Sequence, residues 1–232
     1  MPINTLTPAT TVQAAGSAPA ATAGADELRL DAREYLELKR LVKKQGLLDR
    51  QPVYYVLKVP LTVALLGASV TFLVLVDNLW LQLANAGFLG FVFAQLGLVG
   101  HDAGHQQIFA SIRRNDSISL LVGFLMGMVP SWWHDKHNMR HHSNPNKIGQ
   151  DGDIDVSVLA FTVGRALAKT GLQRFMVRYQ AFLFFPALLL ASVSFLFAGI
   201  HYVLTGGKVR YPVVEPILVV AHLAAYFWLL FM

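Results

Sequence analysis

Residues 78–105, NLWLQLANAGFLGFVFAQLGLVGHDAGH, contain the feature that decides the fold: an uncharged apolar run that leads directly into a pair of histidines. The run before the first histidine is long enough, at roughly 20 residues, to cross a hydrocarbon core of about 30 Å as one helix. Apolar stretches at 59–76, 179–205 and 213–232 have similar lengths. The sequence therefore predicts an all-α integral membrane protein, a helical bundle with about four transmembrane helices.

The composition excludes an ordinary soluble domain. Of the 232 residues, 54% are hydrophobic and 14% are charged, whereas soluble domains average about 25% charged residues. The chain has no cysteine, which excludes disulfides, thiolate metal sites and cysteine nucleophiles. Its formal net charge is +5, but the basic residues lie beside apolar segments. We therefore interpret this charge as a sign of membrane topology and predict no nucleic-acid partner.

The N-terminal part differs from the rest in composition. Residues 1–25 are rich in Ala, Thr and Pro and contain no charged side chain, which predicts a disordered tail. In 26–50, apolar residues recur at steps of three and four between charged ones. This pattern predicts an amphipathic helix that lies on the membrane surface. The remainder, 51–232, is predicted to form one membrane domain.

The positions of Lys and Arg predict the orientation in the membrane. Eight of them lie in 29–58 and nine in 113–178, while only Lys208 and Arg210 lie between the last two apolar stretches. A short uncharged run at 117–133 is ambiguous, and if it does not cross, 17 of the 19 basic residues lie on one face. The positive-inside rule then predicts a cytoplasmic N-terminus and a large cytoplasmic section between the second and third spans.

Histidines gather in that section. Six of the eight lie between residues 101 and 142. His101 and His105 are four residues apart, as are His137 and His141, so each pair is expected on one helix face. Because both pairs belong to the same side of the membrane, they are predicted to converge on metal ions. Imidazole suits Fe, Zn, Cu and Ni alike. The candidate ligands are His101, His105, His137, His141 and His142.

Two polar neighbours of these histidines are candidates for a supporting role. Asp102 and Asn138 are placed to orient imidazole N–H groups, with ordinary interfacial polar residues as the alternative. His134 and His222 receive no assigned role. An ionisable group such as His222 is costly inside an apolar span, but its partner is not visible in the sequence.

At these residues the chain resembles a known family. HDAGH at 101–105 and WWxxKHNxxHHxxPN at 132–146, followed by the acidic segment GQDGDID at 149–155, are similar to motifs of the membrane-bound fatty acid desaturases. The likeness is to the bacterial acyl-CoA and acyl-lipid branch that includes front-end desaturases. It implies a di-iron centre, held by three His boxes on the cytoplasmic face, that uses O2 and two electrons to remove two hydrogens from an acyl chain. By position, His101 and His105 form box one, and His137, His141 and His142 form box two.

The resemblance also implies partners and a location. The substrate would be a fatty acyl-CoA or an acyl-lipid, and the membrane a bacterial plasma membrane. Because the HPGG motif of a cytochrome b5-like domain is not found in the sequence, electrons are expected from a separate ferredoxin, cytochrome or flavin reductase. The family's third box, H/Q-x-x-H-H, is also not found in 51–232. We therefore expect a C-terminally truncated, incomplete desaturase domain.

Other functions remain open at this point. A related di-iron hydroxylase or ketolase would share the His boxes and differ in whether oxygen enters the product. An inactive truncated fragment is a further alternative. A haem-bearing electron carrier would need paired histidines inside facing spans, and a transporter would need ionisable groups at mid-membrane. Both are disfavoured because most of the histidines lie outside the spans.

Overall fold

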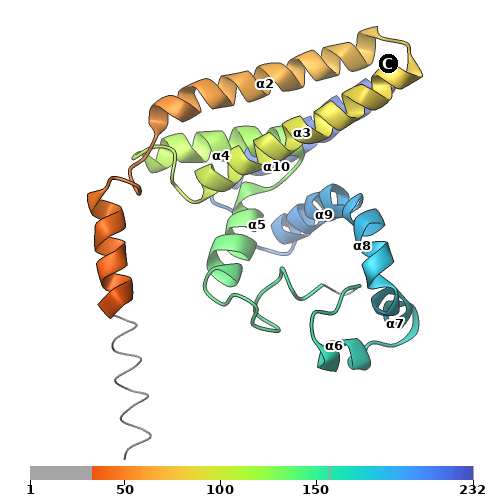
Figure 1. Cartoon of the computed structure of the whole chain (residues 1–232). Coiled ribbons are helices and arrows are strands. Elements are labelled where there is room, and N and C mark those ends of the chain that lie inside the picture. Colours follow the sequence, from red (N-terminus) through yellow and green to blue (C-terminus); the bar gives the residue numbers. More distant parts are fainter. Residues whose placement is uncertain (1–32, 157, 232) are drawn as a thin grey trace, which may run out of the picture. The chain divides into compact units, whose positions relative to one another are not determined.

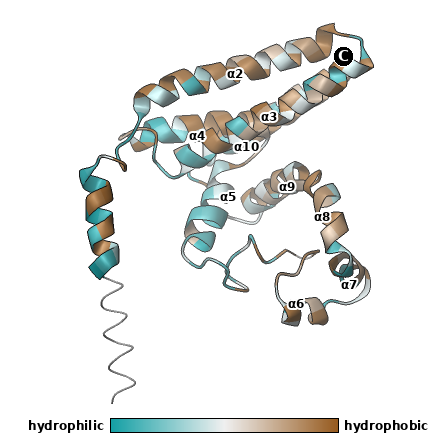
Figure 2. Ribbon diagram, in the orientation of Figure 1, coloured by the Kyte–Doolittle hydropathy of each residue, from teal (hydrophilic) through white to brown (hydrophobic). Residues whose placement is uncertain are grey.

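The computed structural model describes residues 33–156 and 158–231. All regular structure in these ranges is helical (Figure 1), which confirms the predicted fold class. The chain divides into two compact units, Met1–Asp49 and Arg50–Met232. In the first unit, residues 33–44 are helical, and hydrophilic and hydrophobic residues alternate along this helix (Figure 2). The tail predicted at 1–25 lies outside the described residues, and the position of the helix on a membrane stays a prediction.

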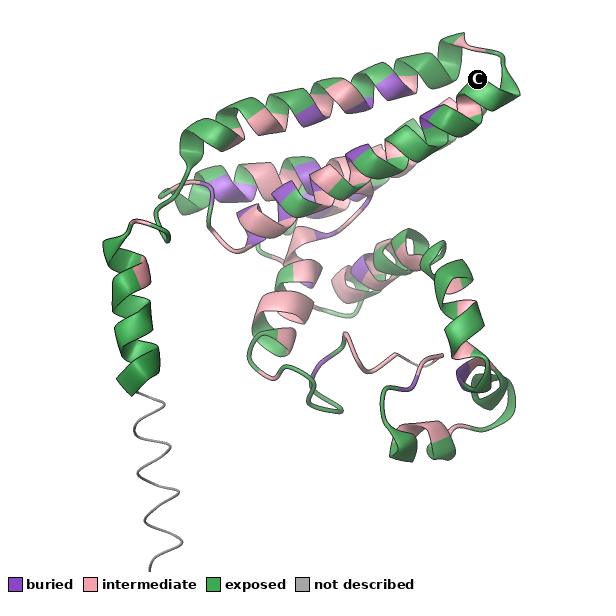
Figure 3. Cartoon of the chain, in the orientation of Figure 1, coloured by how far each residue is buried: buried purple, intermediate pink, exposed green. Residues whose placement is uncertain are grey.

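Two long helices open the second unit. Helices α2 (Pro52–Leu75) and α3 (Leu79–Gly104) are each long and apolar enough to cross a membrane. Asn78 caps α3, because its side-chain oxygen accepts hydrogen bonds from the backbone N–H groups of Trp80 and Leu81 at 3.1 Å each. Most residues of α2 are exposed (Figure 3). Exposed apolar side chains on helices of this length are expected to face lipid.

A buried polar pair joins α2 to α3. Ser69 Oγ donates to Asn85 Oδ1 at 2.7 Å, and Asn85 Nδ2 donates to the Ser69 carbonyl at 3.1 Å. Replacing Asn85 by Leu is expected to lower the free energy of unfolding by about 1 kcal/mol, since hydrogen bonds between membrane helices contribute roughly 0.6–2 kcal/mol. Unfolding by SDS in mixed micelles measures this loss. Thr71→Val, at an exposed position of α2, is the control, and an equal loss in both variants would contradict the prediction.

The third and fourth apolar stretches differ from single straight spans. Residues 179–205 form α8 (Gln180–Leu188) and α9 (Ala191–Leu204), which are bent by 69° relative to each other, as in a broken span or a re-entrant loop. Pro186 lies inside α8, where it removes a backbone donor close to the break. The last stretch forms α10 (Val214–Phe231), a shorter apolar helix. Of about four predicted spans, two are thus single helices of full length.

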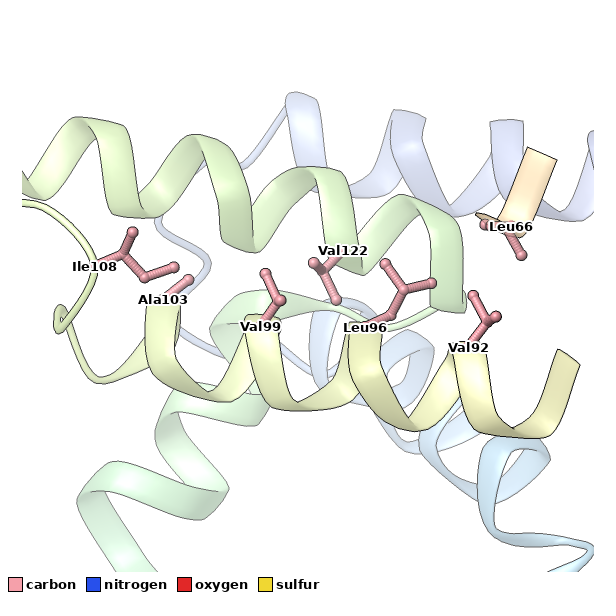
Figure 4. Packing of buried hydrophobic residues seen from close by; sticks show 7 residues of the cluster. All are labelled: Leu66, Val92, Leu96, Val99, Ala103, Ile108 and Val122. Carbon is pink, nitrogen blue, oxygen red and sulfur yellow. The ribbon is translucent and has the colours of Figure 1, made fainter. Parts of the chain in front are cut away.

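The ambiguous run 117–133 does not form a span. It is divided between α4 (Ile112–Met126) and α5 (Pro130–His134), and the left-handed residue Gly127, with φ 67°, ends α4. Helix α4 packs against α3 and α10. The buried core shown in Figure 4 joins α2, α3 and α4 and consists of Leu66, Val92, Leu96, Val99, Ala103, Ile108 and Val122. This packing holds the end of α3, which carries box one.

The connection between α9 and α10 lies beside the start of α4. Arg210 Nη2 is 2.9 Å from Asp116 Oδ2, and the Tyr211 hydroxyl donates to the same oxygen at 2.8 Å. Asp116 is close to box one in sequence, since α4 begins soon after His105. This placement differs from the prediction that Lys208 and Arg210 lie on the face opposite the His boxes. The bend between α8 and α9 is the structural reason, because it lets the chain turn back.

Candidate metal centre

The second His box follows α5 as a π-helix, η1 (Asp135–His141). The backbone N–H of His142 donates to the His137 carbonyl at 3.0 Å, a hydrogen bond between residues five apart. A π-turn contains more residues than an α-turn, so it sets His137 and His142 on one face. The sequence predicted His141 as the partner of His137 at a spacing of four. In the structure His142, five residues after His137, is the residue that joins His137 in the cluster.

Four histidines form a compact cluster. One ring nitrogen from each of His101, His105, His137 and His142 lies within 4.8 Å of the others. His137 is central, because its Nε2 is 3.2 Å from the Nε2 of His101 and 3.2 Å from that of His142. Box one at the end of α3 and box two in η1 therefore converge as predicted. Four of the five predicted ligands share this cluster.

The donor set fits a transition-metal ion. Burial, together with the neighbouring His142 and His101, lowers the pKa of His137 to about 4. His137 is therefore neutral at pH 7 and keeps a lone pair for a metal. Two nitrogens 3.2 Å apart can bind one ion, since this separation is less than two metal–nitrogen bonds of about 2.1 Å. Neutral imidazoles suit Fe, Zn, Cu and Ni, so the ligand chemistry by itself does not select the metal.

The fifth predicted ligand, His141, lies in a second group. Its Nδ1 is 3.0 Å from Asp151 Oδ2 and 3.3 Å from Asp153 Oδ2. Its ring still stacks on that of His137, with centroids 5.3 Å apart. The acidic segment at 149–155 was visible in the sequence, but its carboxylates received no role. The short distance in sequence between this segment and box two was the signal that could have placed them beside His141.

The two predicted supporting residues behave differently. Asp102 Oδ1 lies 3.5 Å from His101 Nδ1, and its Oδ2 accepts a hydrogen bond from the Tyr55 hydroxyl at 2.6 Å. Asp102 thus lies beside the imidazole of His101, and its supporting role stays a prediction. Asn138 instead donates to the Gly104 carbonyl at 2.9 Å. It ties box two to the end of α3, and its Oδ1 is buried without a hydrogen-bond partner among the described residues.

Two further groups in the apolar helices have partners that the sequence did not reveal. His222 Nδ1 donates at 2.7 Å to the carbonyl of Phe124, near the end of α4. Glu215, in the first turn of α10, is buried and was overlooked in the sequence. It accepts hydrogen bonds from the N–H and hydroxyl of Ser131 at 2.9 and 2.6 Å. An acidic residue inside an apolar stretch was the signal that could have identified it.

Two hollows adjoin the cluster, each of about 380 Å³. The first runs past Trp133 between α4, α5 and the α9–α10 connection, with Leu120, Met128 and Met139 in its wall. The second is lined by His101, His105 and His142 of the cluster. His134 lines both hollows but is not one of the four clustered histidines. An apolar ligand in the first hollow would therefore lie beside the candidate metal centre.

The geometry defines a helical protein with apolar, membrane-length helices and a cluster of four histidines, able to hold a metal ion, at the end of one of them. Residues 78–232 match the sequence model of a family described as fatty acid desaturase. The match covers more than half of the chain, and the chain belongs to this family.

Several characterised relatives have similar sequences. An acyl-lipid (9-3)-desaturase of Physcomitrium patens is 29% identical, over 84% of this chain and 38% of the relative. A Delta(5) fatty acid desaturase of Caenorhabditis elegans is 31% identical, over 58% of this chain and 29% of the relative. A Delta(6)-fatty-acid desaturase of the same organism is 29% identical, over 84% and 46%. The chain thus spans less than half the length of these relatives. No solved structure is significantly similar to it.

Proposed function

We propose that this chain forms the metal-binding region of an O2-dependent di-iron fatty acyl desaturase. The observation that carries the proposal is the convergence of four histidine nitrogens within 4.8 Å in a chain of the fatty acid desaturase family. The names of the relatives support an acyl substrate, either a fatty acyl-CoA or an acyl-lipid. The excess of Lys and Arg near the boxes supports a cytoplasmic location for the His boxes and the N-terminus.

The residues would act in two ways. His101, His105, His137 and His142 would hold iron through their ring nitrogens, with His141 as a fifth ligand. The bound iron would supply oxidation of an aliphatic chain by O2. In the overall reaction O2 takes two hydrogens from the acyl chain, together with two electrons and two protons, and leaves as two water molecules. The electrons would come from a separate ferredoxin, cytochrome or flavin reductase.

The remaining residues would position the substrate and exclude water. The hollow beside Trp133 exposes mainly apolar surface, although charged residues such as Asp116 and Arg210 also line it. Its apolar part suits a methylene chain, which is bound by burial of apolar surface. Trp133 separates this hollow from the cluster, since its ring stacks on His137 with centroids 4.6 Å apart. The chain's own residues would thus place a C–H bond near the metal.

Feeding experiments test the proposal. The complete gene is expressed in a host that lacks the corresponding unsaturated fatty acids, and cell lipids are analysed by gas chromatography and mass spectrometry. We expect a new double bond in a fed fatty acid, and we expect it to disappear without O2 or iron. A hydroxylated product would instead identify the related hydroxylase. No product of either kind, despite a supplied electron donor and verified iron loading, would contradict the proposal.

A further inference from the structure

The acidic segment after box two places carboxylates behind two of the candidate ligands. Asp151 Oδ2 lies 3.0 Å from His141 Nδ1, and Asp153 Oδ2 lies 3.9 Å from His137 Nδ1. His137 shows the general arrangement, because its Nε2 faces the cluster while its Nδ1 faces a carboxylate. A histidine that binds a metal through one nitrogen commonly donates its other N–H to a carboxylate. The same arrangement is therefore expected at His141.

The carboxylate of Asp151 is buried and is fixed by hydrogen bonds. Its side chain is 0% exposed, yet both of its oxygens have partners. Oδ1 accepts the backbone N–H of Asp153 at 2.9 Å, and Oδ2 accepts that of Asn146 at 2.8 Å. Hydrogen bonds from two backbone N–H groups favour the ionised form of this carboxylate. An ionised carboxylate only accepts hydrogen bonds, so His141 Nδ1 must carry the proton.

We propose that Asp151 is a positioning residue that fixes the tautomer of His141, with the proton on Nδ1 and with Nε2 left as the metal-binding atom. The inference rests on the proposed function, because it takes His141 as an iron ligand. Asp151 is not itself assigned as a ligand, since its oxygens are already engaged by two backbone N–H groups and one imidazole. Its action on the metal is therefore exerted through His141.

The variant Asp151→Asn separates this role from mere packing. It keeps the shape of the side chain but replaces one accepting oxygen by an NH2 group. Because Oδ2 accepts both from His141 and from the Asn146 N–H, an NH2 group at its position leaves both donors without an acceptor, and His141 is then expected to shift its proton to Nε2, where it blocks metal binding. In full-length protein labelled with 15N-histidine and stripped of metal, the ring nitrogen shifts of His141 report the tautomer, with His141→Gln identifying its signals. A wild-type protein protonated at Nε2 would overturn the inference, as would an unchanged tautomer in Asp151→Leu, which removes both accepting oxygens.

Iron retention provides the second measurement. Release of iron from the loaded, full-length protein to a colorimetric chelator is expected to show about 10–100-fold weaker binding in Asp151→Asn, the usual effect of losing such a partner. Asp155→Asn is the matched control. Asp155 belongs to the same segment, accepts the Gly149 N–H and pairs with Arg165, but contacts no histidine in the described chain. This variant should retain iron as the wild type does.

A double-mutant comparison completes the test. If Asp151 acts through His141, then Asp151→Asn should have no further effect on iron binding once His141 is replaced by Ala. An equal loss in both backgrounds would show that Asp151 supports the fold and would overturn the inference. The tautomer of His141 is measured without metal, so this measurement tests the role of Asp151 independently of the proposed iron-binding function. Failure of the wild type to bind iron would contradict the proposed function, whereas a wrong tautomer would contradict only the role of Asp151.

Discussion

Replacing His137 by Ala is expected to abolish formation of the unsaturated product. His137 lies at the centre of the cluster, with its Nε2 3.2 Å from a nitrogen of His101 and 3.2 Å from one of His142. Alanine removes this donor and puts no other in its place. The loss should exceed the roughly 10–100-fold weakening of metal binding that follows removal of a residue behind a ligand, because a ligand itself is lost. We expect product below the limit of detection and a reduced ratio of iron to protein.

Two other histidines make this experiment specific. His201 is exposed on α9 and lies outside the cluster, so His201→Ala should leave product and iron content unchanged. His134 lines the hollows beside the cluster, and its replacement should have an intermediate effect on product without loss of iron. Lipid analysis and iron determination on the same preparations check all three variants. Wild-type activity in His137→Ala would refute the assignment of the metal centre.

The helical membrane fold could be predicted because length and charge decide it. The helices α2 and α3 correspond to stretches whose apolar character leaves no other stable arrangement in lipid. The break between α8 and α9 could not be predicted in this way, because it depends on contacts between distant residues. Gly199 of α9 approaches Val129, next to α5, and Phe195 packs on Trp132 at 5.4 Å between ring centroids. Hydropathy along one segment contains no information about such contacts.

The candidate site, like the fold, could be predicted only in part. The spacing of box one on an α-helix brought His101 and His105 together as expected. In box two, the choice between His141 and His142 depended on the local helix type, and a π-helix has no simple sequence pattern. The role of Asp151 depends on a turn that buries its carboxylate against the N–H groups of Asn146 and Asp153. The sequence alone indicated only an acidic segment near the site, with no role for this carboxylate.

Replacing Gly104 by Ala should damage the site without removing any ligand. Gly104 is the last residue of α3, and a Cβ atom added there would lie 2.1 Å from Cζ3 of Trp133. The indole must therefore move, and it stacks on His137 and packs edge-on against His101 at 5.7 Å. Overpacking of this kind costs typically about 1–3 kcal/mol. A displacement of about 1 Å at a reaction centre can also lower the rate about 100-fold.

Two variants serve as controls for Gly104→Ala: one at another glycine of α3, and one that also changes Trp133. In Gly97→Ala the new Cβ would be 3.9 Å from Met126 Cε, an ordinary contact, so the thermal midpoint in detergent should be unchanged or raised by the better helix propensity of Ala. Adding Trp133→Phe to Gly104→Ala removes the ring atoms that clash. The double variant should regain stability and iron content relative to Gly104→Ala alone. If it does not, the effect of residue 104 is not transmitted through Trp133.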